Sequence, residues 1–333
     1  MSATHLLVGN PTAQSGKNAE RIERARKWLT DAGVATDFLA TLPAGKTIGA
    51  VTKALDEGGY RCVVYMGGDG TFREVASGLL ASRRKDDVAM GMLPTGTAND
   101  QGKSFGLEAG EDALERNLEV IRAGHETRID AGRVRVAGRE EWFFDSAGWG
   151  ISARVLRERN ADRDWVQKNI PLLGALYRDH LVYAGALLRV FLDSYVTSDK
   201  FSARVTDEHG AAHDLEGLTD LIVKNTRVYG GAWVFDRTSR HDDGLFEIVP
   251  FRGKRDWTSK AIVDLEGNPL SEDVLNEVGI EHSKPFRAAK MDMIFAAAPG
   301  GHALAAQIDG EELPAAERVT IEVVRQAFRL VVP

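Results

Sequence analysis

Three glycine-rich turns carry the residues of this chain best suited to bind a phosphorylated ligand. They are GNPTAQSGK (Gly9 to Lys17), GGDGT (Gly67 to Thr71) and LPTGTAND (Leu93 to Asp100). Glycine lets backbone N–H groups approach an anion closely, and a helix N-terminus adds a favourable dipole. The turns therefore predict a polyphosphate site. For GGDGT taken alone, the competing interpretation is a tight turn that binds nothing.

Neither of two common phosphate-binding loops fits these turns. A Walker A loop has four residues between its first glycine and its Gly-Lys-Ser/Thr. Here six residues separate Gly9 from Gly16, and Asn18 follows Lys17. No G-x-G-x-x-G opens the first predicted helix, so an ordinary P-loop NTPase and a Rossmann dehydrogenase are both excluded.

Two acidic turns lie in the second half of the chain. HDDGLFEIVP places Asp243 just before a strand-like run, and QIDGEEL places Asp309 and Glu311 just after one. Asp-Gly is also a strong hairpin signal, so each motif alone is first of all a turn. Carboxylate and carbonyl oxygens at such turns would suit Mg²⁺, whereas no His or Cys pattern suggests zinc.

The elements around the first three turns predict an α/β domain with a parallel sheet. Short apolar runs, at 5–8, 34–39, 62–66 and 88–93, alternate with helical patterns. The pattern Phe72, Val75, Ala76, Leu79 predicts a helix directly after GGDGT, with Thr71 and Glu74 as its capping box. Because ligands of such sheets bind beyond the carboxyl ends of the strands, the three turns should share one edge.

From about residue 129 the pattern changes to short alternating runs separated by Gly and Asp, which predicts an antiparallel β-sandwich. We therefore expect an α/β domain at 1–128, a sandwich domain at 129–319, and a tail at about 320–333 that packs back on the first domain. A dense apolar stretch predicts a helical insertion at about 165–197. It is either a helix packed on the sandwich or part of a lipid-binding wall.

Composition narrows the classes of function. The chain has 333 residues, a net charge of −7 and one cysteine, Cys62. The charge argues against nucleic-acid binding, and a single cysteine excludes an internal disulfide. The most apolar stretch, Leu181 to Leu192, contains Arg189 and is shorter than a membrane span. With no secretory signal in MSATHLLVGNP, we expect a cytoplasmic protein whose membrane contact is peripheral; a homodimer is compatible with the sequence.

The motifs NP-x4-GK, GGDGT-x2-EV-x2-GL, LP-x-GTAND, DDGL and DGE follow one another along nearly the whole chain. This ordered set resembles the lipid kinases with a diacylglycerol kinase catalytic domain, a family that includes sphingosine kinases. GGDGT alone is shared with NAD kinases, whereas LP-x-GTAND with a later DGE is more specific. The resemblance implies a NAD kinase- or phosphofructokinase-like α/β domain, a β-sandwich domain and a cleft between them. It implies transfer of the ATP γ-phosphoryl to a lipid hydroxyl, and a diacylglycerol-like lipid is the leading acceptor.

The resemblance also implies roles for individual residues. The expected ATP-binding residues are Asn10, Thr41, Gly67, Gly68, Asp69, Gly70, Thr71, Glu74, Thr97 and Asn99. Asp309 is the expected general base, with Glu311 beside it. Asp243 is the expected ligand of a Mg²⁺ ion, with the carbonyls of Arg240 and Leu245, and Asp100 and Asp130 join it in an acidic network.

The segment FFDSAGWGISARV departs from the pattern of that family. Asp145 stands where the family has asparagine, and Ser152 where it has aspartate; Arg73 also replaces a frequent asparagine. Two other functions stay open at this point. One is a small-molecule kinase related to NAD kinase, and the other is a catalytically weak regulator that binds a nucleotide or a lipid.

Overall fold

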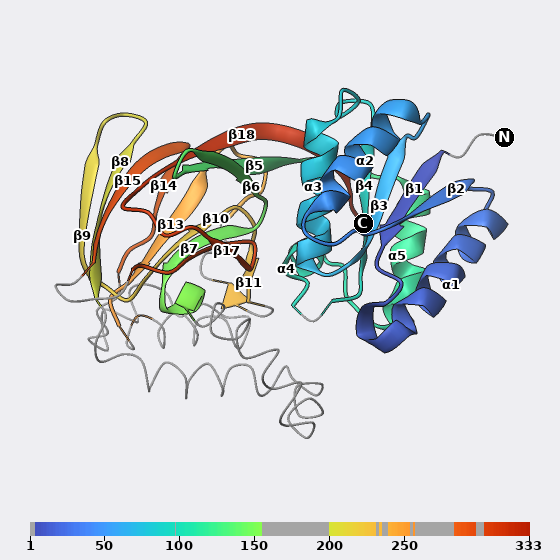
Figure 1. Ribbon diagram of the computed structural model, residues 1–333, viewed down its shortest axis with the longest axis horizontal. Helices are drawn as coiled ribbons and strands as arrows, with labels where there is room; N and C mark the ends of the chain where they lie inside the picture. The colour runs from blue at the N-terminus through green and yellow to red at the C-terminus, as the bar shows by residue number, and fades with distance from the viewer. Residues whose placement is uncertain are drawn as a thin grey trace, which may run out of the picture. The chain divides into compact units, whose positions relative to one another are not determined.

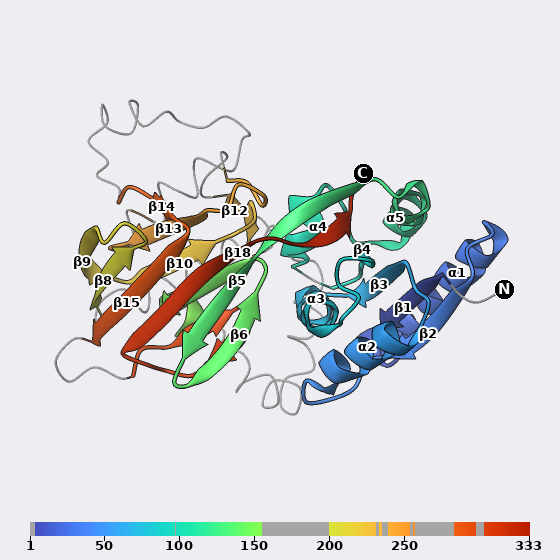
Figure 2. The same ribbon diagram turned by 90° about the horizontal axis from the view of Figure 1, so that it is seen from above.

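The computed structural model describes residues 4–96, 98–154, 200–230, 233–234, 239–253, 256, 283–297 and 303–333. The chain divides into two compact units (Figures 1 and 2). Unit 1 comprises Met1–Ala131, His241–Gly244 and Val324–Pro333, and unit 2 comprises Gly132–Arg240 and Leu245–Val323. The domain boundaries at 128 and 319 remain predictions, and the predicted insertion at 165–197 lies outside the described residues.

Unit 1 is built on a parallel sheet, as predicted. Its strands are β1 (His5–Gly9), β2 (Thr36–Ala40), β3 (Cys62–Gly67) and β4 (Ala89–Pro94), in the order β2-β1-β3-β4. The end of β18 (Arg318–Val331) adds a parallel neighbour to β4. The helices are α1 (Lys17–Asp31), α2 (Lys46–Glu57), α3 (Asp69–Ala81), α4 (Asp100–Ser104) and α5 (Glu111–Ala123), with a 3₁₀ turn η1 (Ala13–Gly16) before α1.

Apolar residues cover both faces of this sheet, which is why β3 and β4 are continuous apolar runs. One core cluster joins Leu7 and Val64 of the strands to Leu29 of α1 and Leu118 of α5. Because neighbouring residues of a strand point to opposite faces, Tyr65 lies on the other side. Its ring meets Phe72 of α3 edge-on, with 5.3 Å between the ring centroids. The sheet is thus held between two helical layers.

The predicted capping box at Thr71 and Glu74 is wrong. Helix α3 begins at Asp69, its N-cap is Gly68, and no side chain caps it. Thr71 is therefore inside the first turn. A β-carbon on Gly67 would lie 2.4 Å from Thr71 Oγ1, so the missing side chain lets Thr71 pack directly over Gly67. The helix therefore starts three residues earlier than the capping pattern indicates.

Unit 2 is antiparallel, also as predicted. One sheet has the order β14-β13-β10-β7-β16-β17, and a second group contains β9, β8, β15, the start of β18, β5 and β6. The bounds are β5 (Glu126–Val136), β6 (Arg139–Phe143), β7 (Ser146–Gly150), β8 (Phe201–Asp207), β9 (Ala212–Leu218), β10 (Asp220–Lys224), β13 (Phe246–Phe251), β14 (Phe286–Ala288), β15 (Lys290–Ala297), β16 (Ala306–Ile308) and β17 (Glu311–Leu313), with a small hairpin of β11 (Val228–Tyr229) and β12 (Trp233–Val234).

One hydrophobic core cluster of the described residues lies in this unit. It joins Trp149 and Leu221 of the six-stranded sheet to Val205, Met291 and Phe295 of the second group. The Trp149 and Phe295 rings stack with 5.1 Å between centroids. Alternating burial along β15 has the two-residue period of a sheet with one face in the core.

None of the described helices of the chain is long and apolar enough to cross a membrane.

The buried position of Cys62 leads to a first testable prediction. Burial, with a smaller contribution from the Glu126 charge, raises the pKa of the Cys62 thiol to about 12. The thiolate is the reactive form, so the folded protein should resist iodoacetamide at neutral pH. Mass spectrometry should find Cys62 unmodified in the folded protein and alkylated in denaturant. Rapid labelling of the folded protein would show that β3 opens locally.

Candidate active site

The GGDGT and GTAND turns lie against each other in unit 1. They follow the neighbouring strands β3 and β4, at the carboxyl edge of the sheet. The carbonyl oxygen of Gly67 accepts hydrogen bonds from the backbone N–H groups of Thr95 (2.7 Å) and Gly96 (3.2 Å). A β-carbon on Gly96 would lie 2.5 Å from Gly68 Cα. The two turns therefore form one continuous backbone surface, which requires glycine at this contact.

Asn99 closes the second turn with its side chain. Its Oδ1 accepts the Gly96 N–H at 2.9 Å, and its Nδ2 donates to the Gly96 carbonyl at 2.6 Å. The residue has a φ of 52°, is 1% exposed and forms the N-cap of α4. Asparagine tolerates this left-handed conformation better than most residues. Asn99 thus shapes the turn, and the predicted ligand Thr97 lies outside the described residues.

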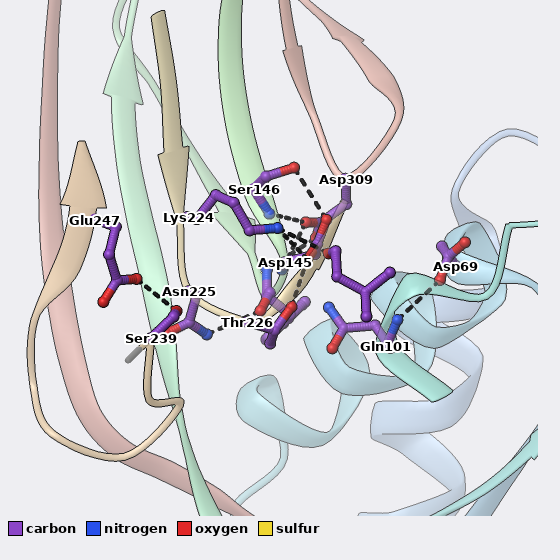
Figure 3. A network of polar contacts seen from close by, with 12 residues as sticks. Asp69, Gln101, Asp145, Ser146, Lys224, Asn225, Thr226, Ser239, Glu247 and Asp309 are labelled. Atoms are coloured by element: carbon purple, nitrogen blue, oxygen red, sulfur yellow. Dashed lines mark hydrogen bonds and ion pairs between the residues drawn. The ribbon is translucent and has the colours of Figure 1, made fainter. Parts of the chain in front are cut away.

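Asp69 links α3 to α4. It occupies the first turn of α3, and its Oδ1 accepts the backbone N–H of Gln101 at 3.3 Å (Figure 3). Asp100, the first residue of α4, directly precedes Gln101 and is buried. Gly70, Thr71 and Glu74 follow Asp69 in the first turns of α3. The acid of GGDGT therefore fixes the relative placement of the two helices that follow the glycine turns.

Burial, and secondly the charge of Asp69, raises the pKa of Tyr65 well above its usual value. The Tyr65 hydroxyl is fully buried and has no hydrogen-bond partner within the described parts of the chain. A buried unpaired hydroxyl costs stability, so Tyr65→Phe should raise the free energy of unfolding by about 1 kcal/mol. Urea unfolding measures the change. A loss of stability would show that the hydroxyl is bonded in solution.

Tyr60 is the matched control. Its hydroxyl donates to Asp37 Oδ2 at 2.7 Å, so Tyr60→Phe should lower the free energy of unfolding by about 0.5 kcal/mol. Burial first, and then the Asp37 bond and charge, raise the pKa of Tyr60 from 10.0 to about 12. As the pH rises, the Tyr60 hydroxyl therefore stays protonated to a higher pH in the folded state than in the unfolded state. The stability that this protonated hydroxyl contributes is complete below pH 10 and is lost towards pH 12. Tyr60→Phe should remove that part of the alkaline loss.

The NP turn follows β1, next to β3 at the same edge of the sheet. Asn10 Oδ1 accepts bonds from the Thr12 backbone N–H (3.0 Å) and hydroxyl (2.8 Å). The Asn10 carbonyl accepts the buried side-chain amide of Asn18 at 2.7 Å. The Thr41 N–H donates to the Gly9 carbonyl at 3.0 Å. Thr41 is thus joined to the end of β1, directly before Asn10, and a shared ligand for the two residues stays a prediction.

Asp130 organises the DDG turn in unit 1. Its Oδ2 accepts the Gly244 N–H at 2.7 Å, its Oδ1 accepts the Gln326 N–H at 2.6 Å, and its own N–H donates to the His241 carbonyl at 2.7 Å. The ring of Phe105, just after α4, meets the ring of His241 with 4.8 Å between centroids. Asp130 therefore holds the acidic turn, and Phe105 attaches it to α4.

This acidic turn fits a cation. Burial raises the pKa of Asp130, two backbone hydrogen bonds oppose the shift, and the charges of Asp243 and Asp242 add to it. A bound cation would relieve this accumulated negative charge. Mg²⁺ prefers carboxylate and carbonyl oxygens, so Asp243 with the flanking carbonyls of Arg240 and Leu245 remains the predicted ligand set. Within the described residues, no three His, Cys, Asp or Glu side chains cluster in a metal-binding arrangement, so carbonyls would have to complete the set.

Asp309 lies in unit 2 with its carboxylate in a cradle of backbone N–H groups. Its Oδ2 accepts from Phe144 (2.8 Å), and its Oδ1 accepts from Asp145 (2.8 Å) and Ser146 (3.1 Å) (Figure 3). Asp309 itself has a φ of 47° and is buried. Such bonds orient a carboxylate and stabilise its ionised form. Glu311, two residues later at the start of β17, is exposed.

The cradle depends on residues that the sequence reasoning missed. The Asn225 N–H donates to the Asp145 carbonyl, and its side chain donates to the Phe144 carbonyl, both at 2.8 Å. Thr226 Oγ1 donates to Asp145 Oδ1 in a short hydrogen bond, and Lys224 Nζ lies 3.6 Å from the same oxygen. The signal in the sequence is the polar run KNT that ends the apolar run LIV. The sequence does not show which residues this run contacts, because strand pairing joins residues that are far apart in the chain.

Ser152, the second departure from the family pattern, has a different environment. Its backbone N–H donates to Asp220 Oδ1 at 2.8 Å, and Asp220 is fully buried at the start of β10. Asp220 thus anchors the backbone at Ser152 and makes no hydrogen bond to its hydroxyl. The residues that follow Ser152 from 155 to 199 lie outside the described part of the chain.

The two units, with a parallel α/β sheet in one and antiparallel sheets in the other, define a class of fold with solved examples. A diacylglycerol kinase from Bacillus anthracis superposes with a TM-score of 0.71 at 20% identity, covering 100% of this chain and 98% of that one. A second diacylglycerol kinase structure from the same organism gives a TM-score of 0.68 at 18% identity over 100% and 98% of the two chains. At such identities the likeness shows the fold alone.

Sequence comparison finds one family model and several relatives that resemble this chain. Residues 4–134 match the family described as "Diacylglycerol kinase catalytic domain". "Probable lipid kinase YegS" of Salmonella gallinarum is 29% identical over 243 residues, which are 72% of this chain and 73% of that protein. "Probable lipid kinase YegS-like" of Cronobacter sakazakii is 32% identical over 159 residues, only 47% of this chain and 49% of that protein. These matches confirm the predicted resemblance to the lipid kinases with a diacylglycerol kinase catalytic domain.

Proposed function

We propose that this protein is an ATP- and Mg²⁺-dependent lipid kinase that transfers the γ-phosphoryl of ATP to a lipid hydroxyl. A diacylglycerol-like lipid is the first acceptor to consider. The observation that carries the proposal is the close contact of the GGDGT and GTAND turns. A β-carbon on Gly96 would lie 2.5 Å from Gly68 Cα, so backbone alone forms the surface at this contact. Phosphoryl transfer relies on positioning and charge neutralisation, which a rigid backbone surface at helix N-termini can supply.

On the nucleotide side, the backbone of Gly67 to Thr71 would bind the ATP phosphates, with Asn10, Thr41, Glu74 and Thr97 as further contacts. Asp69 would keep α3 and α4 in register through its bond to Gln101. Mg²⁺, when bound, neutralises phosphate charge and so supports the transfer. Asp243 with the carbonyls of Arg240 and Leu245 would hold a metal, and Asp130 would fix the turn that bears them.

On the acceptor side, Asp309 would orient the lipid hydroxyl and take its proton as the oxygen bonds to the γ-phosphorus. The bond between that phosphorus and the bridging oxygen of ATP breaks, and ADP leaves. Backbone N–H bonds hold the Asp309 carboxylate in one orientation, which a general base requires. Glu311 is proposed as a neighbouring acid. Peripheral contact with a membrane, a cytoplasmic location and a homodimer remain predictions from the sequence.

The test is transfer of labelled γ-phosphate from ATP, with Mg²⁺, to acceptors in mixed micelles. The panel holds diacylglycerol, monoacylglycerol, ceramide, sphingoid bases and phosphatidylglycerol, with NAD as a soluble control. Label on diacylglycerol supports the proposal in full, and label on another lipid corrects the acceptor. Label on NAD would support the NAD kinase-related alternative. ATP binding without any labelled acceptor would favour a regulator.

A further inference from the structure

We propose that the contact between Phe105 and His241 couples the DDG turn to the two glycine turns, GGDGT and GTAND, with α4 as the element that transmits the coupling. The order of the DDG turn would then set the affinity of the glycine turns for ATP. Phe105 and His241 would be positioning residues, since neither side chain need touch a substrate. The inference rests on the proposed role of the glycine turns as the ATP site.

The DDG turn belongs to unit 1 as a separate piece of four residues. Unit 1 includes His241–Gly244, and the residues directly before and after this piece belong to unit 2. The four residues form neither helix nor strand, so contacts with other segments must hold them in place. One attachment is Asp130, whose carboxylate accepts the Gly244 N–H at 2.7 Å and whose own N–H donates to the His241 carbonyl at 2.7 Å.

The aromatic contact is a second attachment of the DDG turn, and it leads to α4. The ring of Phe105 meets the His241 ring at 67°, with 4.8 Å between the centroids. Such an edge-on arrangement is favourable for a pair of aromatic rings. His241 Nε2 lies 3.4 Å from Thr127 Oγ1, which adds a polar contact to the same ring. Phe105 is fixed to the end of α4, because its backbone N–H donates to the Gly102 carbonyl at 3.1 Å.

Helix α4 connects this contact to both glycine turns. Its five residues form little more than one turn of helix, and its N-cap is Asn99, the residue that closes the GTAND turn. The Gln101 N–H donates to the Asp69 carboxylate of the GGDGT turn at 3.3 Å (Figure 3). A displacement of Phe105 would therefore move Asn99 and Gln101, which hold the two glycine turns.

The packing of α4 leaves little room for independent movement. A β-carbon on Gly102 would lie 2.6 Å from Pro94 Cγ and 3.1 Å from the Leu107 carbonyl oxygen. The helix thus lies directly against the end of β4. Phe105 and His241 are only half-buried, so their contact adds less to the core than the fully buried rings of the chain do. We therefore expect this contact to act on the position of α4 more than on stability.

The experiment is a double-mutant cycle of Phe105→Leu, His241→Leu and the combined variant, with ATP affinity measured by calorimetry. Each single variant should bind ATP about two- to tenfold more weakly, which corresponds to the loss of one aromatic contact. The double variant should lose no more than either single variant, because the contact is already broken. His241→Phe keeps an aromatic ring and should bind ATP nearly as the wild type does. Unchanged affinity in the single variants, or losses that add in the double variant, would overturn the coupling.

A further variant tests whether the order of the DDG turn is what α4 transmits. Asparagine has one acceptor oxygen where the Asp130 carboxylate offers two, one to the Gly244 N–H and one to the Gln326 N–H. Asp130→Asn should therefore loosen the turn and weaken ATP binding when Phe105 is present. In the Phe105→Leu background the same change should have no further effect on ATP affinity. An equal loss in both backgrounds would refute transmission through Phe105.

Unit 2 offers a matched control. His213 of β9 and Phe286 of β14 also form a half-buried contact between a histidine and a phenylalanine ring, with 4.2 Å between the centroids. His213→Leu and Phe286→Leu should leave ATP affinity unchanged. If they lower it as much as the variants of Phe105 and His241 do, the losses come from general loosening of the protein and the coupling is refuted.

Hydrogen exchange without nucleotide separates this inference from the proposed activity. In His241→Leu, the backbone amides of residues 98–106 should exchange about two- to tenfold faster, although His241 is far from them in the sequence. The His213→Leu control should show wild-type exchange in this range. If the wild-type protein binds no ATP, the proposed function fails while the exchange rates still decide the coupling. Wild-type exchange at 98–106 in His241→Leu would show that the DDG turn does not position α4.

Discussion

Asp309→Asn should abolish phosphoryl transfer while the protein still binds ATP. The amide cannot accept a proton from the acceptor hydroxyl, so kcat should fall by about 10²–10⁴-fold, the usual contribution of a general base. ATP affinity should stay unchanged, because the proposed phosphate-binding residues belong to unit 1 and Asp309 to unit 2. Labelled phosphate transfer and calorimetric ATP titration measure the two effects separately.

The substitution also tests the cradle around Asp309. Three backbone N–H groups face its two oxygens, and an asparagine would turn an NH₂ group towards at least one of them. We expect a loss of about 1–3 kcal/mol in the free energy of unfolding, since a buried donor loses its acceptor. Asp214→Asn on β9 is the control: it should leave the rate unchanged and cost little stability, because exposed ion pairs contribute little. Wild-type turnover in Asp309→Asn would remove Asp309 from the role of base.

The sequence was sufficient for features that depend on neighbouring residues. Alternation of apolar runs with helical patterns predicted the parallel sheet, and the glycines predicted turns at its carboxyl edge. The helix after GGDGT was also predicted, but its start was wrong. The side chain of Thr71 packs on Gly67 instead of capping, and no local pattern shows that contact.

The surroundings of Asp309 could not be predicted for a different reason. Lys224, Asp145 and Asp309 are far apart in the sequence, and they meet only because β10, β7 and β16 are adjacent. Asp145 could be identified as a departure from the pattern of the family that the chain resembles, yet the lysine that lies beside this acid comes from another strand. A buried charge is readable from the sequence only when its partner is local, and here the partner is set by strand order.

Gly96→Ala should have the largest effect on the nucleotide side. Its new β-carbon would lie 2.5 Å from Gly68 Cα, 2.9 Å from Asn99 Oδ1 and 3.2 Å from Gly68 N. Two of these atoms are backbone, and the third is fixed by its hydrogen bonds to Gly96, so the turns must separate. We expect ATP affinity to fall by about 10–100-fold, equivalent to about 1.4–2.7 kcal/mol, because the phosphate-binding amides lose their alignment.

Gly49→Ala is the matched control for this steric effect. Gly49 lies inside α2, and a β-carbon there would meet nothing within 4 Å. Alanine is the better helix former, so this variant should gain up to about 1 kcal/mol in the free energy of unfolding and bind ATP normally. Calorimetric ATP titration of both variants separates the loss of a side-chain-free contact from the general effect of replacing glycine. If Gly96→Ala binds ATP as tightly as Gly49→Ala, the contact between GGDGT and GTAND does not shape the phosphate site, and the observation that carries the kinase proposal loses its force.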